Sequence, residues 1–501
     1  MAKVVVFLFV LSAVASSLPN GHGDDELLSE MLTVPVPQFM GTLQPVLGII
    51  GQVTSSIAML GFVGDPRSSM ALDDCVELLG KTYNEVGYTL EASQSSSGSK
   101  VNGTGNLRSD MKIWLSAAST NQDTCMQGFE GINGFFFGII LGTLNQITSI
   151  TQQTLSMIGE TPGFGGGGGF PVWLSHHDRK LLLDSSIVPD AVVAQDGTGN
   201  YFTIMEAVNA SADYSNYRYV IYIKRGYYDE NVIISTRKWN IMLIGDGTGQ
   251  TIISNNRNVV DGFTTYNSAT VGVNGKGFFA KDITFENRAG PEKHQAVAMR
   301  SSSDLSVFSR CEFRGYQDTL YAHSLRQFYK ECVITGTVDF IFGNAAAVFQ
   351  NCYIEVKQGL PNQKNAMTAH GRFDPNQPTG FALQYCNISA SIELLQNLNT
   401  TMSFLGRPWK NFSRTVVMQS YISDAISPSG WLEWNGDQNL DTLFYGEYGN
   451  SGPGSNLSAR VTWPGFHVLN SSFASNYTVS QLIDGDYWLP STGVSYSSGL
   501  A

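Results

Sequence analysis

Two aspartates and three cysteines recur along this 501-residue chain at nearly the same interval. Asp318 and Asp339 lie 21 residues apart, Cys311 and Cys332 keep the same interval, and Cys352 follows 20 residues later. A period near 20 residues with alternating apolar positions is typical of a stacked solenoid. Equivalent residues in such a stack lie on neighbouring strands, roughly 4.8 Å apart. The spacing therefore predicts two adjacent carboxylates on one surface.

The part of the chain after residue 180 has the pattern of short strands. Segments rich in β-branched or aromatic residues recur there, bounded by Gly, Asn or Asp and without helices between them. This pattern indicates a parallel β-helix rather than a dinucleotide-binding α/β sheet. The clearest strand segments are 220–224, 241–244, 251–254 and 281–285.

The part before residue 160 has the pattern of helices. Helices of this length pack as a bundle, and a disulfide between Cys75 and Cys125 would join two of them. The apolar spacing predicts helices over 43–60, 75–89, 107–125 and 135–157.

Five consecutive glycines, 165–169, separate the two parts and predict a flexible linker. The same linker contains Arg179, Lys180, Leu181 and Leu182, which begin with a dibasic pair. A dibasic pair in an exposed linker is a target for a processing protease. An ordinary charged loop is the alternative interpretation.

The first residues are typical of a secretory signal. Lys3 precedes an apolar run, 4–15, which ends in small residues and is too short to span a bilayer comfortably. A signal anchor is the alternative, and no later segment has the length of a membrane-spanning helix. Secretion agrees with the even number of six cysteines and with eight N-x-S/T sequons. The sequons are at Asn102, Asn209, Asn387, Asn399, Asn411, Asn456, Asn470 and Asn476.

Charge and histidine content exclude some functions. The formal net charge is −12, and no stretch is basic enough to indicate a nucleic-acid partner. The seven histidines are scattered without a pair at zinc-ligand spacing, so we expect no metal site. The chain has no G-x-S-x-G motif, which argues against a serine hydrolase of the α/β type.

Adjacent carboxylates suggest acid–base chemistry. Two such groups cannot both ionise easily, so the pKa values of Asp318 and Asp339 should be pushed apart. Carboxylates about 5 Å apart also suit a retaining glycosidase, and buried aspartates can simply cap turns. Gln317 directly precedes Asp318, and Gln295 lies about one coil earlier. Two amide donors beside the pair could bind an oxyanion, which favours ester hydrolysis, although glutamines also form internal polar ladders.

Further residues could complete such a site. Arg407, in the segment LGRPW (405–409), could keep an aspartate ionised, or it could form a surface salt bridge. Four aromatic residues could stack on sugar rings or could belong to the core: Tyr321, Phe342, Trp409 and Trp431.

Most of residues 188–495 resembles a plant pectin methylesterase, and the first part resembles that family's N-terminal pectinesterase-inhibitor-like pro region. The segment DMKIWLSAASTNQDTCMQGFE (110–130) carries the resemblance of the pro region, and FPVWLSHHDRKLL (170–182) resembles the family's processing site. The enzyme part matches in GYYDENV (226–232), KHQAVAMR (293–300), GYQDTLY (315–321), QFYKECVITGTVDFIFGNAAAVFQ (327–350) and LGRPW (405–409).

The resemblance implies a right-handed parallel β-helix that hydrolyses methyl esters of homogalacturonan to de-esterified pectin and methanol. It makes Asp339 the nucleophile and Asp318 the general acid and then base. Gln295 and Gln317 would form the oxyanion hole, and Arg407 would orient Asp339.

The same resemblance implies substrate contacts and a disulfide. Thr265, in VDGFTTYNSAT (260–270), and Trp409 match substrate-contacting positions. Cys332 and Cys352 match a bridged pair. No metal or organic cofactor is required.

The expected protein is mainly β, with a right-handed parallel β-helix catalytic domain preceded by an all-α, four-helix-bundle-like pro domain. The expected divisions are a signal peptide (1–15), a pro region (24–160), a linker with its processing site (161–183) and the catalytic domain (184–501). We expect a secreted, extracellular monomer of the cell wall whose partners are methyl-esterified homogalacturonan, a processing protease and a proteinaceous pectinesterase inhibitor.

Two alternatives stay open at this point. A retaining β-helix glycoside hydrolase acting on pectin would release new reducing ends instead of methanol. A non-catalytic wall-binding or inhibitor protein would release neither product.

Overall fold

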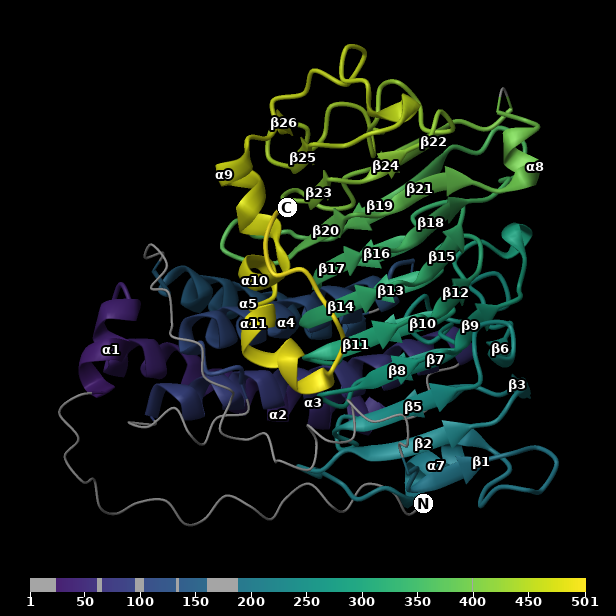
Figure 1. The fold of residues 1–501 in the computed structure, drawn as a ribbon. Coiled ribbons are helices and arrows are strands. Elements are labelled where there is room, and N and C mark those ends of the chain that lie inside the picture. The colour runs from purple at the N-terminus through teal and green to yellow at the C-terminus, as the bar shows by residue number, and fades with distance from the viewer. Residues whose placement is uncertain (1–23, 61–64, 95–102, 132–134, 160–187, 399) are drawn as a thin grey trace.

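The computed structural model describes residues 24–60, 65–94, 103–131, 135–159, 188–398 and 400–501, which form a helical part and a β-helix (Figure 1). The predicted signal peptide, 1–15, lies outside the described residues. The predicted processing residues Arg179, Lys180, Leu181 and Leu182 lie outside them as well.

The helical part agrees with the four predicted segments; α2, α3 and α4 are longer than predicted, and α5 ends one residue earlier. In α2, Phe39, Leu43, Val46 and Ile50 follow one another at helical spacing and are buried, so this face packs against the other helices. The helices are α1 (Asp24–Met31), α2 (Val36–Leu60), α3 (Pro66–Gln94), α4 (Leu107–Gly128) and α5 (Phe135–Ser156).

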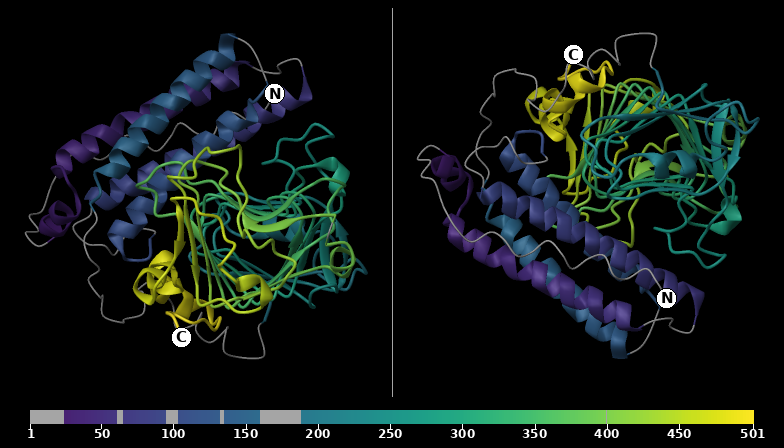
Figure 2. Two further views of the ribbon diagram at one scale, coloured as in Figure 1. Left: turned by 90° about the horizontal axis from the view of Figure 1, so that it is seen from above. Right: turned by 90° about the horizontal axis from the view of Figure 1, so that it is seen from below.

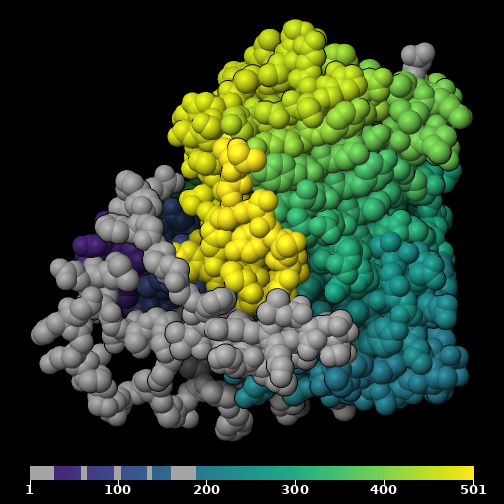
Figure 3. Space-filling model, in the orientation of Figure 1, coloured from purple at the N-terminus to yellow at the C-terminus, as the bar shows by residue number. Residues whose placement is uncertain are grey.

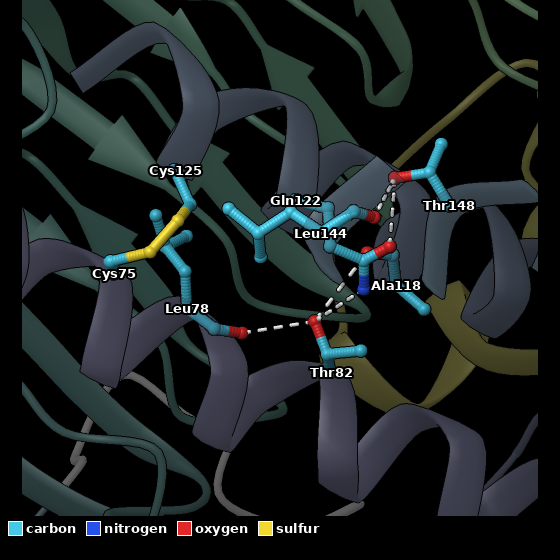
Figure 4. The surroundings of a disulfide bond; sticks show 8 residues. All are labelled: Cys75, Leu78, Thr82, Ala118, Gln122, Cys125, Leu144 and Thr148. Atoms are coloured by element: carbon cyan, nitrogen blue, oxygen red, sulfur yellow. Dashed lines mark hydrogen bonds between the residues drawn. A yellow bond between two sulfur atoms is a disulfide. The ribbon is translucent and has the colours of Figure 1, made fainter. Parts of the chain in front are cut away.

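A disulfide joins α3 to α4, as predicted (Figure 4). It links Cys75 to Cys125, which are separated by 50 residues in the sequence. Buried polar contacts lie beside it: the Thr82 hydroxyl donates to the Leu78 carbonyl at 3.0 Å, and the Gln122 amide donates to Thr82 at 3.3 Å. The covalent link and these bonds fix the pair of helices that faces the β-helix.

The second part is a parallel β-helix, as predicted, with three sheets along its axis. One sheet contains β4 (Val232–Ile234), β7 (Val271–Val273), β10 (Met299–Ser301), β13 (Leu320–Ala322), β16 (Ile341–Gly343), β19 (Asn365–His370) and β22 (Ser403–Gly406). A second contains β3 (Gly226–Asp229), β6 (Thr251–Asn255), β9 (Thr284–Asn287), β12 (Glu312–Arg314), β15 (Val333–Gly336), β18 (Tyr353–Val356), β21 (Asn387–Ala390) and β24 (Tyr421–Ile422).

The third sheet is the longest, and a short helix, α7 (Ile204–Ala210), lies at its beginning. The sheet contains β1 (Ala191–Val193), β2 (Tyr219–Ile223), β5 (Ile241–Gly245), β8 (Phe279–Lys281), β11 (Ser306–Ser309), β14 (Arg326–Lys330), β17 (Ala346–Gln350), β20 (Gly380–Gln384), β23 (Arg414–Met418), β25 (Phe444–Tyr448) and β26 (Phe466–Val468).

Side chains stack in rows inside the β-helix because each coil repeats the register of the one before. The Tyr329 ring stacks on Phe308 at 4.8 Å and on Phe349 at 4.6 Å between ring centroids. Such in-register aromatic rows stabilise a solenoid, since each coil buries the apolar surface of its neighbour.

The cysteines form another row, and here one prediction is wrong. Cys332 and Cys352 are not bonded to each other; both are buried free thiols, as are Cys311 and Cys386. The Cys332 thiol donates to the Phe308 carbonyl at 3.4 Å and the Cys352 thiol to the Tyr329 carbonyl at 3.5 Å. Equivalent residues of in-register coils have parallel Cβ directions, whereas a disulfide needs side chains that converge.

The helical part packs along the β-helix through α3 and α4 (Figure 2). Several of the contacts are polar. The Asp74 carboxylate accepts a hydrogen bond from Thr264 at 2.5 Å, and Thr120 accepts one from the Asn344 amide at 2.9 Å. Thr124 contacts the His323 ring nitrogen at 2.9 Å.

A fully buried arginine, Arg326, joins three separate segments. Its guanidinium lies 2.6 Å from Asp110 of α4, 2.6 Å from Asp304 of the β-helix and 3.7 Å from Asp484. Asp484 belongs to the C-terminal segment, which contains α9 (Ser471–Ala474), α10 (Val479–Leu482) and α11 (Gly485–Trp488) and lies over the third sheet beside the helical part (Figure 3). Its last residues are also hydrogen-bonded to this sheet: the Gln350 side-chain amide donates to the Ser497 carbonyl at 2.9 Å.

The helices of the described ranges include no candidate for crossing a membrane. None of them combines the length and the apolar composition that a bilayer crossing needs.

Candidate active site

The two repeated aspartates lie side by side at the start of neighbouring strands. Asp318 precedes β13 and Asp339 precedes β16 by the same two positions, and Leu320 pairs with Ile341 in the ladder between these strands. Both aspartates have left-handed backbones, with φ of 63° and 50°. Aspartate tolerates this conformation better than most residues. The coil repeat thus places both carboxyl groups on one surface.

Among the described residues, an arginine holds only one of the two carboxylates. Arg407 follows β22 and donates two hydrogen bonds to Asp339, one to each oxygen and both 2.7 Å long. Its guanidinium also lies 4.3 Å from the centroid of the Trp434 ring. A bidentate pair of this kind fixes the carboxylate plane and favours the ionised form.

The environment shifts the pKa values of the two carboxyl groups apart, as the sequence predicts. Burial raises the pKa of Asp318 well above its usual range, the charge of Asp339 raises it further, and Arg407 lowers it. Burial also raises the pKa of Asp339, but there the hydrogen bonds and charge of Arg407 act against burial. The environment therefore favours the ionised form at Asp339 and the protonated form at Asp318.

Gln295 and Gln317 line the same cavity as the two aspartates. Within the described part of the chain, neither side-chain amide forms a hydrogen bond with another residue, so both can donate to a ligand. Their backbones are fixed by the coil: the Gln295 carbonyl accepts from Val259 at 3.0 Å, and the Gln317 carbonyl accepts from Ala296 at 3.3 Å.

Three of the four predicted aromatic residues belong to the cavity. Tyr321 and Phe342 stack on neighbouring strands at 4.1 Å, and Trp409 meets the Phe342 ring at 5.9 Å and 62°. All three line the cavity, as does Thr265. This is an apolar platform next to the carboxylates, of the kind on which sugar rings stack.

Trp431 does not belong to the site, so the prediction that it contacts substrate is wrong. It is 1 % exposed, stacks on Tyr445 at 4.2 Å and donates its indole N–H to Glu447 at 3.1 Å. Its backbone forms a bridge to Gly406, so it continues the coil and its ring points into the core. Trp434, three residues later and not predicted, lines the cavity instead.

The cavity has a volume of about 370 Å³ and lies between the two parts of the molecule. From the β-helix, it is lined by the catalytic candidates Gln295, Gln317, Asp318, Asp339 and Arg407 together with the aromatic residues. From the helical part, it is lined by Arg67, Asp74, Thr124, Gln127, Gly128 and Glu130. The contribution of the helical part cannot be read from the repeat, because it depends on how two separate folds dock.

Known proteins resemble both parts. The family model of pectinesterase matches residues 190–486, and the model of plant invertase/pectin methylesterase inhibitor matches residues 50–157. A probable pectinesterase/pectinesterase inhibitor of Arabidopsis thaliana is 53 % identical over 99 % of this chain and 97 % of its own length. A pectinesterase/pectinesterase inhibitor of Prunus persica is 55 % identical over 95 % of this chain and 91 % of its own.

Solved structures resemble the β-helix. Pectin methylesterase from carrot is 52 % identical, with a TM-score of 0.63, and matches 63 % of this chain over 100 % of its own. Pectin methylesterase from Aspergillus niger is 31 % identical, with a TM-score of 0.52, and matches 60 % of this chain over 96 % of its own. Together with the carboxylate pair, these matches show that the chain belongs to the pectinesterase family, whose members are carboxylic ester hydrolases.

Proposed function

We propose that this pectinesterase removes methyl groups from homogalacturonan with Asp339 as the nucleophile and Asp318 as the general acid and then base. The observation that carries the assignment is the asymmetry of the pair. Arg407 holds both oxygens of Asp339, while the pKa of buried Asp318 lies well above its usual range. A nucleophile needs the ionised form and an acid needs its proton, so the surroundings of each residue favour the state that its role requires.

The first half of the reaction forms an acyl-enzyme. A carboxylate oxygen of Asp339 bonds to the ester carbonyl carbon, and the carbonyl electron pair moves to oxygen. When this oxyanion collapses, the bond to the methoxy oxygen breaks and Asp318 gives its proton to that oxygen. Methanol leaves, and an anhydride joins Asp339 to the galacturonate carboxyl carbon.

The second half regenerates the enzyme. Asp318, now a carboxylate, takes a proton from water, and the resulting hydroxide attacks the anhydride. The bond to the Asp339 oxygen breaks, which restores the carboxylate of Asp339, the proton of Asp318 and a free galacturonic acid, which ionises in water.

Gln295 and Gln317 stabilise the oxyanion of both steps in this proposal. Both line the cavity with their amide groups unengaged by other described residues. One donor of this type lowers the barrier by about 2.7–4 kcal/mol. The two glutamines also favour an ester over a glycoside as substrate, because glycoside hydrolysis has no tetrahedral oxyanion. The similarity to pectinesterases likewise disfavours the glycosidase and the non-catalytic alternatives.

The assignment is tested by methanol release from highly esterified pectin. We expect Asp339→Ala to abolish release while the circular dichroism spectrum stays unchanged. Asp282→Ala is a matched control, because Asp282 also has a left-handed backbone, with φ of 58°, and a bidentate arginine, Arg310, at 2.8 and 2.6 Å, outside the cavity. Methanol release by a folded Asp339→Ala variant would refute the roles assigned to the two aspartates.

We also propose that the chain is a precursor whose helical part restricts access of the polymer to the site. Thr124, Gln127 and Glu130 of the helical part line the cavity opposite the aspartates, which supports this. The division into signal peptide (1–15), pro region (24–160), linker (161–183) and catalytic domain (184–501) belongs to the same proposal, with secretion to the cell wall, cleavage by a protease at Arg179–Leu182, and a monomer as product.

The masking proposal is tested by comparing the full chain with residues 184–501. The match with the carrot enzyme covers 63 % of this chain and 100 % of the carrot chain. The carrot β-helix therefore folds without a helical part. We expect the shorter form to release methanol at least tenfold faster from polymeric pectin. Equal rates from the two forms would refute masking but not the catalytic roles.

A further inference from the structure

An ion pair between the helical part and the cavity wall involves a lysine that the mechanism does not use. Lys410 lines the cavity, and its ammonium lies 2.9 Å from the Asp123 carboxylate of α4. Both side chains are mostly buried, with 25 % and 20 % exposed. Gln127 donates to the other Asp123 oxygen at 2.5 Å, so the carboxylate is held in a fixed position.

Lys410 belongs to the same short segment as two residues of the site. Arg407 binds Asp339, Trp409 meets the Phe342 ring, and the Lys410 ammonium lies 5.6 Å from the Trp409 ring centroid. The lysine is therefore placed beside the sugar platform by the segment that also orients the nucleophile.

Lys410 is the cation of the cavity wall that can bind an anion once the helical part has moved away, because the other cation contributed by the β-helix is bound to Asp339. Among the described residues that line the cavity from the β-helix, the cations are Arg407 and Lys410. Arg407 is committed to Asp339 through two hydrogen bonds. Lys410 loses its partner when Asp123 departs, and its ammonium is then available for a charge-assisted hydrogen bond to another anion.

We propose that Lys410 is a binding site for a free galacturonate carboxylate, and that Asp123 occupies in the full chain the place of this substrate group. The inference rests on the proposed function, since the carboxylate belongs to a galacturonan whose neighbouring residue carries the methyl ester at Asp339. A methyl ester has no charge and cannot form the ion pair. The site therefore distinguishes a galacturonate residue from its methyl ester.

The test uses residues 184–501 and two oligogalacturonides of equal length, one fully methyl-esterified and one with about half of its carboxyl groups free. The quantity measured is the ratio of kcat/KM for methanol release from the two oligomers, at low salt. We expect the wild-type ratio to favour the partly free oligomer by about tenfold, the factor that one charge-assisted hydrogen bond supplies. We expect Lys410→Met to remove this preference and Lys410→Arg to keep it.

Lys364→Met is the matched control. Lys364 is an exposed lysine of the β-helix, paired with Glu433 at 3.8 Å and outside the cavity, and its substitution should leave the ratio at the wild-type value. Raising the salt concentration should reduce the wild-type preference, which tests the ion pair without any substitution.

The outcomes distinguish failure of the carboxylate site from failure of the esterase assignment. A wild-type ratio near one, or an unchanged ratio in Lys410→Met, overturns the carboxylate site while the esterase roles stand. If the wild-type form releases no methanol from either oligomer, the proposed function itself is overturned.

Discussion

Replacing Arg407 tests the electrostatic basis of the carboxylate pair. Arg407→Met removes both 2.7 Å hydrogen bonds to Asp339 and keeps an apolar side chain against Trp434. Burial already raises the pKa of Asp339, and Arg407 is what acts against it. Without the guanidinium, the pKa of Asp339 rises further, so the carboxylate is lost at a higher pH.

The size of this shift follows from the two bonds. A hydrogen bond to a charged group contributes about 1.5–3 kcal/mol, so two such bonds contribute about 3–6 kcal/mol. One pKa unit corresponds to about 1.4 kcal/mol, so the acidic limb of the rate profile should move up by about two to four units. At a pH just above the wild-type limb, the rate should fall about 100-fold or more.

The assay is methanol release by residues 184–501 between pH 4 and 9, for wild type, Arg407→Met and Arg407→Lys. Arg407→Lys keeps the charge without the bidentate geometry and should give an intermediate shift. Arg310→Met removes an equivalent bidentate pair with Asp282 and should leave the profile unchanged. An acidic limb that stays in place in folded Arg407→Met would refute the reasoning, because Asp339 would then not be the group that must ionise.

Three other outcomes are expected. Asp318→Asn keeps the shape of the side chain without the acid, so methanol release should fall at least 100-fold, and a folded variant with wild-type rates would contradict its role. Asp110→Asn weakens the bond to buried Arg326, so the full chain should lose about 1.5–3 kcal/mol of unfolding free energy in urea, and an unchanged midpoint would contradict it. Cys75→Ser removes the disulfide to Cys125, which closes a loop of 50 residues. The unfolding free energy of the helical part should fall by about 4 kcal/mol. The melting temperature should fall, and reducing agent should lower that of the wild type by the same amount.

The sequence predicts most of the site because the site is built on the repeat. A 21-residue interval places Asp318 and Asp339 at equivalent positions of adjacent coils, and no knowledge of long-range docking is needed. Arg407 comes from a coil farther along the same axis. The family resemblance predicts that it orients Asp339, and the structure adds that it binds both carboxylate oxygens.

The errors arise where side-chain direction decides the role. Trp431 and Trp434 differ by three residues, and only the bridge from Trp431 to Gly406 determines which indole enters the core. Cys332 and Cys352 have the spacing of neighbours, but in-register coils keep their side chains parallel. The contacts of Asp74 and Thr124 with the β-helix were not predicted, because the docking of two folds leaves no periodic pattern in either.

The junction at Arg326 makes the two ends of the chain thermodynamically dependent on each other. Asp110 comes from the N-terminal helices and Asp484 from the C-terminal segment, yet both neutralise one guanidinium together with Asp304. Asp484 also accepts hydrogen bonds from Asn106 and Ser109 at the start of α4. When the helices leave, the C-terminal segment loses these two bonds and keeps its ion pair with Arg326, so release of the first part of the chain loosens the attachment of the last.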